Sequence, residues 1–220
     1  MIKHYLKVAF RNLMKYKTQS LVSIIGLAVG FTCFALSVLW IRYEMTYDTF
    51  HKGAERIYMV RAHYTDIPEH ISNSTPYPLA AYLQEKMPEI EAKATTSIHQ
   101  NVKIRMENDE YEVVMAAADS AFMNFFHIQL LKGTVNFLKE NNPEIAVTEE
   151  FAKKLFGSED DALGKEMEVN GRSRQIGAIV SGWSRHSNIP YSVLVAARHS
   201  PRWKSGPEQL FIRVRAGMDM

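Results

Sequence analysis

The sequence predicts an α+β protein in which an N-terminal amphipathic helix and one transmembrane helix precede a larger domain of mixed helices and strands. Three observations support this prediction. Residues 18–41 form a long stretch without a charged residue, and the residues before it carry only positive charge. The residues after position 42 contain no cysteine, and they alternate between helical and strand-like patterns of apolar residues.

The uncharged stretch predicts a membrane-spanning helix. Residues 18–41 lack Asp, Glu, Lys, Arg and His, and they are bounded by Lys17 and Arg42. A helix of this length would be about 36 Å long at roughly 1.5 Å per residue, which suffices to cross a hydrocarbon core of about 30 Å with some tilt. One alternative is a helix buried in a soluble protein, but such helices rarely run this long without a charge. The other is a cleaved signal peptide, but the apolar run is too long and no small-x-small cleavage site follows it. We therefore expect an uncleaved anchor over residues 18–42.

The distribution of charge predicts the orientation of this anchor. No acidic residue precedes it, and the preceding cations are Lys3, Lys7, Arg11, Lys15 and Lys17. Because positive charge stays in the cytoplasm, we expect the N-terminus inside and the residues after about 43 outside. Trp40 and Tyr43 lie where an outer aromatic belt is expected.

Residues 1–17 predict an amphipathic helix on the cytoplasmic side. Apolar residues share one face, namely Ile2, Leu6, Ala9, Phe10, Leu13 and Met14. The four-residue spacing of Lys3, Lys7, Arg11 and Lys15 forms a basic stripe. Such a helix can lie in the membrane interface with its cations on anionic lipid, or it can act only as a positive-inside signal. We predict that these four cations, together with Trp40 and Tyr43, anchor the chain at the two interfaces.

Two glycines one turn apart lie inside the predicted anchor. Gly26 and Gly30 form a G-x-x-x-G pattern, which lets a second helix approach closely. Glycine is common in membrane helices, so a chance match is the alternative. We predict a helix-packing face at this pair.

Composition narrows the function of the region over residues 43–220. Six of the 26 cations of the chain lie in the first 42 residues, which leaves 20 cations against 24 anions in the rest. A mildly acidic domain is a poor nucleic-acid binder, so we expect no nucleic-acid partner. The single cysteine, Cys33, lies in the anchor, so this domain must be stable through its core without a disulfide.

The region after the anchor predicts several short elements. The strand-like segments are residues 57–64, 92–99, 102–106, 112–117, 165–169, 174–180, 191–196 and 209–215. The helical segments are residues 76–86, 120–126 and 149–156, the second capped by Asp119 or Ser120 and the third stopped by Gly157. Hairpins are expected at residues 107–110 and, most strongly, at Asn170-Gly171.

Motifs for catalysis are weak in this sequence. Gly157 and Gly164-Lys165 resemble a P-loop, but the spacing is too long and Glu166 replaces the Ser or Thr that binds the metal. Ser184 lies in a segment that lacks the second glycine of a nucleophile elbow. The eight histidines form no metal-binding motif. We therefore expect no catalytic residue, no metal site, no cofactor and no enzymatic activity.

Residues along the whole chain resemble one family in their order. They are LKVAFRNLMKYKTQSLVSIIGLAVG at the start, then Tyr47, Asp48, Phe50 and His51, Arg56, Ile57 and Tyr58, Ala118, Asp119, Ser120 and Phe122, Leu131 and Gly133, Val147, Thr148 and Glu149, Ala152, Lys153, Lys154, Phe156 and Gly157, and Leu163, Gly164 and Lys165. This ordered set resembles the MacB-like permeases of ABC transporters, which are related to FtsX, in the type found in Bacteroidetes. His186-Ser187-Asn188 falls where that family has a short polar turn.

The resemblance implies a division of the outer region into two parts. One is an α/β porter-like subdomain over about 52–100 and 191–220, and the other is an inserted β-rich subdomain over about 101–190. It also implies three further membrane helices after this region, whereas nothing after Arg42 approaches eighteen apolar residues. From the sequence we therefore expect a truncated or fragmentary permease.

The resemblance also implies a function and its partners. It indicates the permease subunit of an exporter or mechanotransmission system in the bacterial inner membrane, with its main domain in the periplasm. ATP hydrolysis by a cytoplasmic ABC ATPase would move this domain. A second permease copy, a periplasmic adaptor or substrate protein, and membrane lipid complete the expected partners. The alternative is a single-span sensor or ligand-binding module anchored in the membrane.

Overall fold

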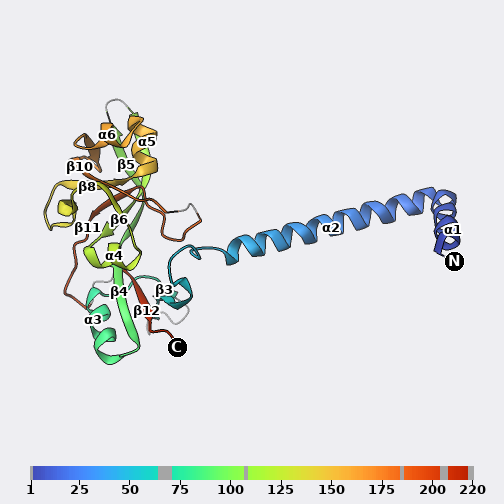
Figure 1. Ribbon diagram of the computed structural model, residues 1–220, viewed down its shortest axis with the longest axis horizontal. Coiled ribbons are helices and arrows are strands. Elements are labelled where there is room, and N and C mark those ends of the chain that lie inside the picture. Colours follow the sequence, from blue (N-terminus) through green and yellow to red (C-terminus); the bar gives the residue numbers. More distant parts are fainter. Residues whose placement is uncertain (1, 64–70, 107–108, 184–185, 204–207, 218–220) are drawn as a thin grey trace. The chain divides into compact units, whose positions relative to one another are not determined.

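The computed structural model describes residues 2–63, 71–106, 109–183, 186–203 and 208–217 (Figure 1). The chain forms two compact units, Met1–Tyr47 and Asp48–Met220, and each is described by itself. The first is entirely helical among its described residues, and the second mixes helices with strands. This arrangement confirms the α+β class that the sequence predicts.

The N-terminal unit consists of two helices. α1 spans Ile2–Lys15 and α2 spans Lys17–Met45, with Tyr16 between them. α2 has no buried residue, and in the described part of the chain it is the one helix long and apolar enough to cross a membrane. Within it, a Cβ added at Gly26 or Gly30 would meet nothing within 4 Å, so both glycines leave open helix surface.

A small antiparallel sheet with one covering helix forms one end of the C-terminal unit (Figure 1). Its strand order is β1-β12-β4, and the bounds are Ile57–Val60 for β1, Gln209–Val214 for β12 and Ile90–Thr96 for β4. The helix α3, Tyr77–Lys86, begins just after Pro76 and packs Ala80 into this part of the core. The 3-10 helix η1, Ala54–Arg56, leads into β1, and the remaining elements here are the short paired strands β2, Ala62–His63, and β3, Ile71–Ser72.

The rest of the unit is a seven-stranded sheet with the order β7-β10-β8-β11-β6-β5-β9. The strand bounds are Ile98–Met106 for β5, Asp109–Ala118 for β6, Leu130–Gly133 for β7, Glu144–Thr148 for β8, Glu166–Val169 for β9, Arg172–Val180 for β10 and Val193–Ala196 for β11. Because β9 pairs with both β5 and β10, all of these strands except β7 close into a barrel. β7 pairs with β10 outside the ring.

The barrel is filled by side chains that alternate along its strands. The buried residues of this interior cluster on the strands are Val102, Ile104, Val113, Ile145, Val147, Met167, Val169, Ile176, Ile179 and Val193. One end is closed by α5, Glu149–Phe156, and α6, Glu159–Ala162, which bury Phe151, Ala152 and Ala162 in the same cluster. Both helices lie at the end of the unit away from the small sheet (Figure 1).

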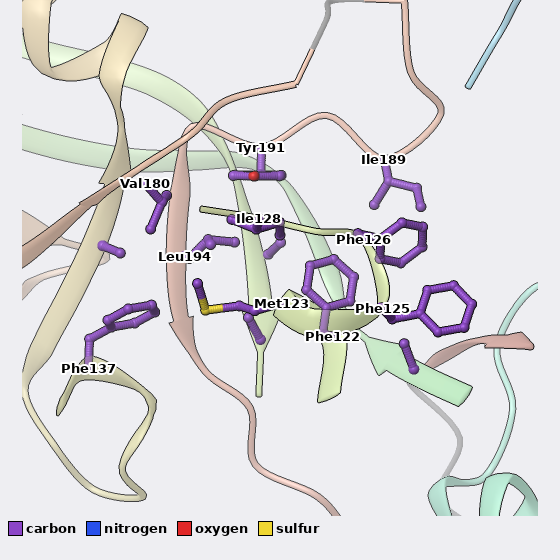
Figure 2. Packing of buried hydrophobic residues seen from close by; sticks show 14 of the residues in the cluster. Phe122, Met123, Phe125, Phe126, Ile128, Phe137, Val180, Ile189, Tyr191 and Leu194 are labelled. Atoms are coloured by element: carbon purple, nitrogen blue, oxygen red, sulfur yellow. The ribbon is translucent and has the colours of Figure 1, made fainter. Parts of the chain in front are cut away.

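A second apolar cluster packs on the outer side of the barrel. It centres on α4, Ser120–Phe125, which the side chain of Asp119 caps by accepting a hydrogen bond from the Phe122 N–H at 2.6 Å. Figure 2 shows Phe122 and Phe125 projecting from this helix beside Phe126. Phe211 from β12 belongs to the same cluster, which therefore joins the small sheet to the barrel. The 3-10 helix η2, Val135–Leu138, contributes one more phenylalanine.

Several expected elements are present with shifted bounds. The helices expected at 76–86, 120–126 and 149–156 correspond to α3, α4 and α5. β9 and β10 form the expected hairpin, and Asn170 and Gly171 have positive φ angles of 47° and 75°, as a type I′ turn requires. β5 and β6 pair as expected, although residues 107–108 of their turn lie outside the described residues.

Three expectations differ from the structure, and the first is the strand expected at 57–64, which is divided between β1 and β2 in two different sheets. The strand expected at 92–99 is divided, because β4 ends at Thr96 in the small sheet and β5 begins at Ile98 in the barrel. Residues 191–196 were assigned to the porter-like part, but β11 pairs with β6 and β8 in the barrel. Val193 and Leu194 are both fully buried there, so both faces of this apolar strand are covered.

Candidate functional site

The carboxylate of Asp48 fixes the segment that follows α2 to the C-terminal unit. α2 ends at Met45, and Asp48 is the first residue of the unit. Its oxygens accept hydrogen bonds from the Ser187 hydroxyl, from the Asn188 backbone N–H at 3.1 Å and from the Asn188 side-chain amide at 2.9 Å. The Asp48 N–H donates to the carbonyl of His186 at 3.2 Å. We call Asp48, Ser187 and Asn188 the Asp48 latch.

The latch depends on the local backbone at Asp48. This residue has a φ of 56°, in the left-handed region that aspartate and asparagine enter more readily than bulky residues. Its side chain is 28% exposed, so the hydrogen bonds to its carboxylate are partly shielded from water. Each hydrogen bond to a charged group typically contributes about 1.5–3 kcal/mol. Three donors on one partly buried carboxylate therefore make a strong attachment point.

Next to the latch, His51 inserts its ring among aromatic side chains. The ring centroid lies 4.3 Å from Phe50, 5.0 Å from Phe126 and 4.8 Å from Trp183. The side chain is only 6% exposed, and this burial lowers the pKa of His51 below its ordinary value, although the nearby Asp48 charge opposes the shift. At neutral pH the ring is therefore uncharged and acts as an apolar plug.

Trp183 extends this plug into the apolar cluster on the barrel. It packs edge-on against Tyr191 with a centroid distance of 4.8 Å and lies 5.2 Å from Phe126. The Tyr191 hydroxyl donates to the carbonyl of Ser181 at 2.8 Å, and burial raises the pKa of Tyr191 above its ordinary range. Tyr191 and Phe126 are labelled in Figure 2, where they lie on the same side of the cluster. His51 is thus continuous with the main core.

Arg56 provides a third attachment of the same segment. Its guanidinium donates to the carboxylate of Glu91 at 2.9 Å and to the carbonyl of Val214 at 3.1 Å. These two acceptors belong to β4 and to the end of β12, so Arg56 ties the segment to the small sheet. The segment from Asp48 to Arg56 is therefore held at both the barrel and the small sheet.

The arrangement around Asp48 is mechanical in character. A carboxylate saturated with donors is poorly placed to act as a base, and the neutral His51 ring lies in an aromatic pocket. The contacts made by the segment from Asp48 to Arg56 can transmit a displacement of residue 48 to the 187–188 turn, the apolar cluster and the small sheet.

The site residues predicted from sequence all lie in the N-terminal unit. Lys7, Arg11 and Lys15 are exposed on α1, and the side chain of Lys3 lies outside the described ones. Trp40 and Tyr43 are exposed on α2, with ring centroids 6.3 Å apart. Their interfacial anchoring, and helix packing at Gly26 and Gly30, stay predictions.

The segment that resembles a P-loop has a structural role. The Gly164 N–H donates to the carbonyl of Ile176, and the Ile176 N–H donates to the carbonyl of Lys165, both at 2.8 Å. These bonds attach the segment to β10. Because the Gly164 N–H is used in one of them, it is not available to bind a phosphate. Among the described residues, the structure contains no group of three acidic, histidine or cysteine side chains that could hold a metal ion.

Sequence reasoning found the two halves of the latch but not their contact. Asp48 and the turn His186-Ser187-Asn188 both carried the family resemblance, yet they lie about 140 positions apart in the chain. Asp48 and the Ser187-Asn188 pair are short polar residues in two separate turns, and this could have suggested that they form hydrogen bonds with each other. The aromatic neighbours of His51, above all Trp183, were missed because isolated aromatic residues are ordinary core residues.

The fold of this unit resembles the folds of three solved domains. Its structure resembles that of a domain from Porphyromonas gingivalis with a suggested permease role, at 23% identity and a TM-score of 0.64, over 77% of this chain and 79% of that one. It also resembles the extracellular domain of the noncanonic ABC-type transporter YknZ from Gram-positive bacteria, at 12% identity and a TM-score of 0.52, over 73% and 83%. The periplasmic region of MacB from Actinobacillus actinomycetemcomitans matches at 13% identity and a TM-score of 0.51, over 74% and 75%.

Residues 20–220 match the model of the MacB-like periplasmic core domain, so the chain belongs to that family. It carries the MacB-like periplasmic domain of an ABC transporter permease, as the ordered residues predict. Comparison with curated proteins finds no match.

Proposed function

We propose that this chain couples ATP hydrolysis by a cytoplasmic ABC ATPase to motion of its periplasmic domain, for export or mechanotransmission across the bacterial inner membrane. In this proposal α2 crosses the membrane with the N-terminus inside, and α1 lies on the inner interface with Lys3, Lys7, Arg11 and Lys15 on anionic lipid. A second permease copy packs through the face at Gly26 and Gly30.

The Asp48 latch is the single observation that carries this proposal. Only Thr46 and Tyr47 separate the end of α2 from Asp48. An extended residue spans at most about 3.6 Å, so a two-residue connection can absorb little displacement before the latch is loaded. A sensor that binds its ligand passively needs no such short, multiply bonded connection. The attachment favours transmission of force over simple tethering.

Hydrogen–deuterium exchange can test this coupling without knowledge of the substrate. The full chain is purified from its native membrane with the ATPase that accompanies it, and exchange is compared with and without ATP. The proposal predicts an ATP-dependent change in the segments over residues 48–56, 90–96 and 187–189. In the Asp48→Ala variant the ATPase rate should persist, while the ATP-dependent change in exchange beyond residue 56 should be lost.

A matched control removes a nearby charge that makes no latch contact. Lys52→Gln alters an exposed cation in the same segment. It should retain the full ATP-dependent change. Equal responses from Asp48→Ala and the wild type would contradict transmission through the latch, and the absence of any accompanying ATPase would contradict the proposed partner.

Orientation has its own test. Gln100 is exposed on β5, so a cysteine introduced there in a Cys33→Ala background can be labelled by an impermeant thiol reagent on intact spheroplasts. We expect labelling before lysis. Protection of the site until lysis would rule out the proposed orientation.

A further inference from the structure

The barrel opens at its uncapped end into a cleft of about 490 Å³. It forms where two neighbouring strands diverge. β11 pairs with β8 only through Val193 and Leu194, and beyond this point Ala196 stays paired with β6. On the other side, Glu144 and Ile145 of β8 pair with β10 instead. The mouth of a barrel is a frequent place for a small-molecule site, and the volume lies within the usual range for one.

Three arginines line this cleft. Residues at alternate positions of a strand face the same side, and Arg172 and Arg174 continue the inward-facing series of Ile176, which is fully buried in the barrel. The inward-facing side chains of β10 thus change from apolar in the barrel interior to cationic at the mouth of the barrel. Arg198, which follows β11, contributes the third guanidinium.

The contacts of these guanidiniums leave most of their donors available. Arg174 donates to the carbonyl of Asn142 at 3.4 Å, and Arg198 donates to the side-chain oxygen of Asn141 at 3.3 Å. Both are long hydrogen bonds to neutral acceptors. Within the described part of the chain, none of the three arginines forms an ion pair with a carboxylate. A guanidinium carries five donors in a fork that matches a carboxylate.

Two glutamates also border the cleft, and they differ in their partners. Glu208 lies 3.2 Å from the Nδ1 atom of His199, which offsets its charge. Glu144 has a buried Oε2 atom that meets no hydrogen-bond donor among the described residues. Its position depends on Gly177, since a Cβ there would lie only 2.5 Å from this oxygen. Glu144 alternates along β8 with Ile145, which faces the barrel interior, so its carboxylate packs against Gly177 on the outer face of the sheet and not into the cleft.

We propose that this cleft binds a small organic polycarboxylate. Carboxylates of the ligand would pair with Arg174 and Arg198. The small side chains of Ala117 and Ala196 leave space for the ligand between the strands. This proposal stands on the cleft alone and is independent of coupling through the Asp48 latch.

Two related anions provide the probes. Citrate carries three carboxylates and one hydroxyl, and tricarballylate is the same molecule without the hydroxyl. Each is titrated calorimetrically into the full chain in phosphatidylcholine nanodiscs, with empty nanodiscs as the blank and inorganic phosphate as a third probe. We expect saturable binding of citrate and of tricarballylate, with weaker binding of phosphate.

Variants of the cleft locate the binding. Removing two charge-assisted contacts in Arg174→Gln/Arg198→Gln should weaken citrate at least about tenfold. Ala196→Leu, which narrows the cleft and keeps every charge, should weaken it as well. Arg61→Gln/Arg215→Gln, which removes two exposed cations elsewhere, should bind like the wild type.

Several results would overturn the proposal. These are the absence of saturable binding by all three probes, equal citrate affinity in the cleft variants and the control, or phosphate binding at least as tight as citrate.

Discussion

His199 lies between two carboxylates, with its Nδ1 atom 3.2 Å from an oxygen of Glu208. Its Nε2 atom lies 3.3 Å from an oxygen of Asp119, and its ring stacks on Tyr77 at a centroid distance of 3.9 Å. The four residues come from the start of α3, the cap of α4 and the two sides of the β11–β12 connection. His199 thus joins the helix of the small sheet to the helix beside the barrel.

The first prediction follows from the charge of His199. The contact with Asp119, and then that with Glu208, raises the pKa of His199 to about 9. A raised folded pKa contributes stability that is fully present below the unfolded value of about 6.5 and is lost as the pH rises through 9. We expect the free energy of unfolding of the C-terminal unit to fall by about 1–3 kcal/mol between pH 6.5 and 9. Chemical denaturation measures it.

The control for this prediction is His199→Gln, which can keep a hydrogen bond but cannot be charged. It should be less stable at pH 6.5 and should lose the decrease at alkaline pH. An unchanged alkaline decrease in this variant would assign the effect to another group.

The second prediction has the opposite sign and concerns His51. Burial lowers the pKa of His51, so the unfolded chain binds a proton more readily than the folded one. The stability that the neutral His51 ring contributes is present above the unfolded pKa of about 6.5. It is lost as the pH falls from this value toward the lower pKa of the folded state. His51→Phe keeps an aromatic plug without a titrating group. We expect this variant to resist acid unfolding better than the wild type, and equal acid sensitivity would show that the plug is not the cause.

The third prediction compares two glycines with the same backbone angle. Gly133 and Gly157 both have a φ of 82°, but a Cβ at Gly133 would lie 2.2 Å from the carbonyl oxygen of Gly177, whereas one at Gly157 would meet nothing within 4 Å. Gly157→Ala should cost about 1–2 kcal/mol for the left-handed backbone alone. Gly133→Ala should cost at least about 2 kcal/mol more, because β7 must move away from β10. Equal losses in thermal unfolding would contradict this close approach.

Short-range features of this fold could be predicted from the sequence. Asn170-Gly171 identified the β9–β10 turn, Asp119 was one of the two residues expected to cap α4, and the uncharged run identified α2. Each depends on the backbone preference or polarity of residues that are close in the chain.

The long-range pairings could not be predicted in the same way. β11 joins β6 and β8 rather than its neighbour in sequence β12, and nothing in its short apolar run distinguishes the two sheets. Asp48 and Asn188 of the latch lie far apart in the chain, and only folding brings them into contact. The arginines of the cleft became a group only because the barrel closes around β10.

The fourth prediction concerns the open surface at Gly26 and Gly30. If a partner helix packs there, Gly26→Leu/Gly30→Leu should weaken association by about 1–2 kcal/mol or less. A two-hybrid membrane assay with the isolated helices measures this, and Ile24→Leu, on the opposite side of the same helix, is the control. An unchanged signal would leave these glycines as ordinary residues of a membrane helix.

The most direct test of coupling through the Asp48 latch lengthens the connection without touching the latch. Two glycines inserted between Tyr47 and Asp48 add up to about 7 Å of slack and leave every latch contact in place. Two glycines inserted between residues 107 and 108, in the connection between β5 and β6, serve as the control. Hydrogen–deuterium exchange of the periplasmic domain is then measured with and without ATP in the presence of the ATPase partner. We predict that the first insertion abolishes the ATP-dependent change while ATP hydrolysis continues, and a full ATP-dependent change in that variant would contradict the account.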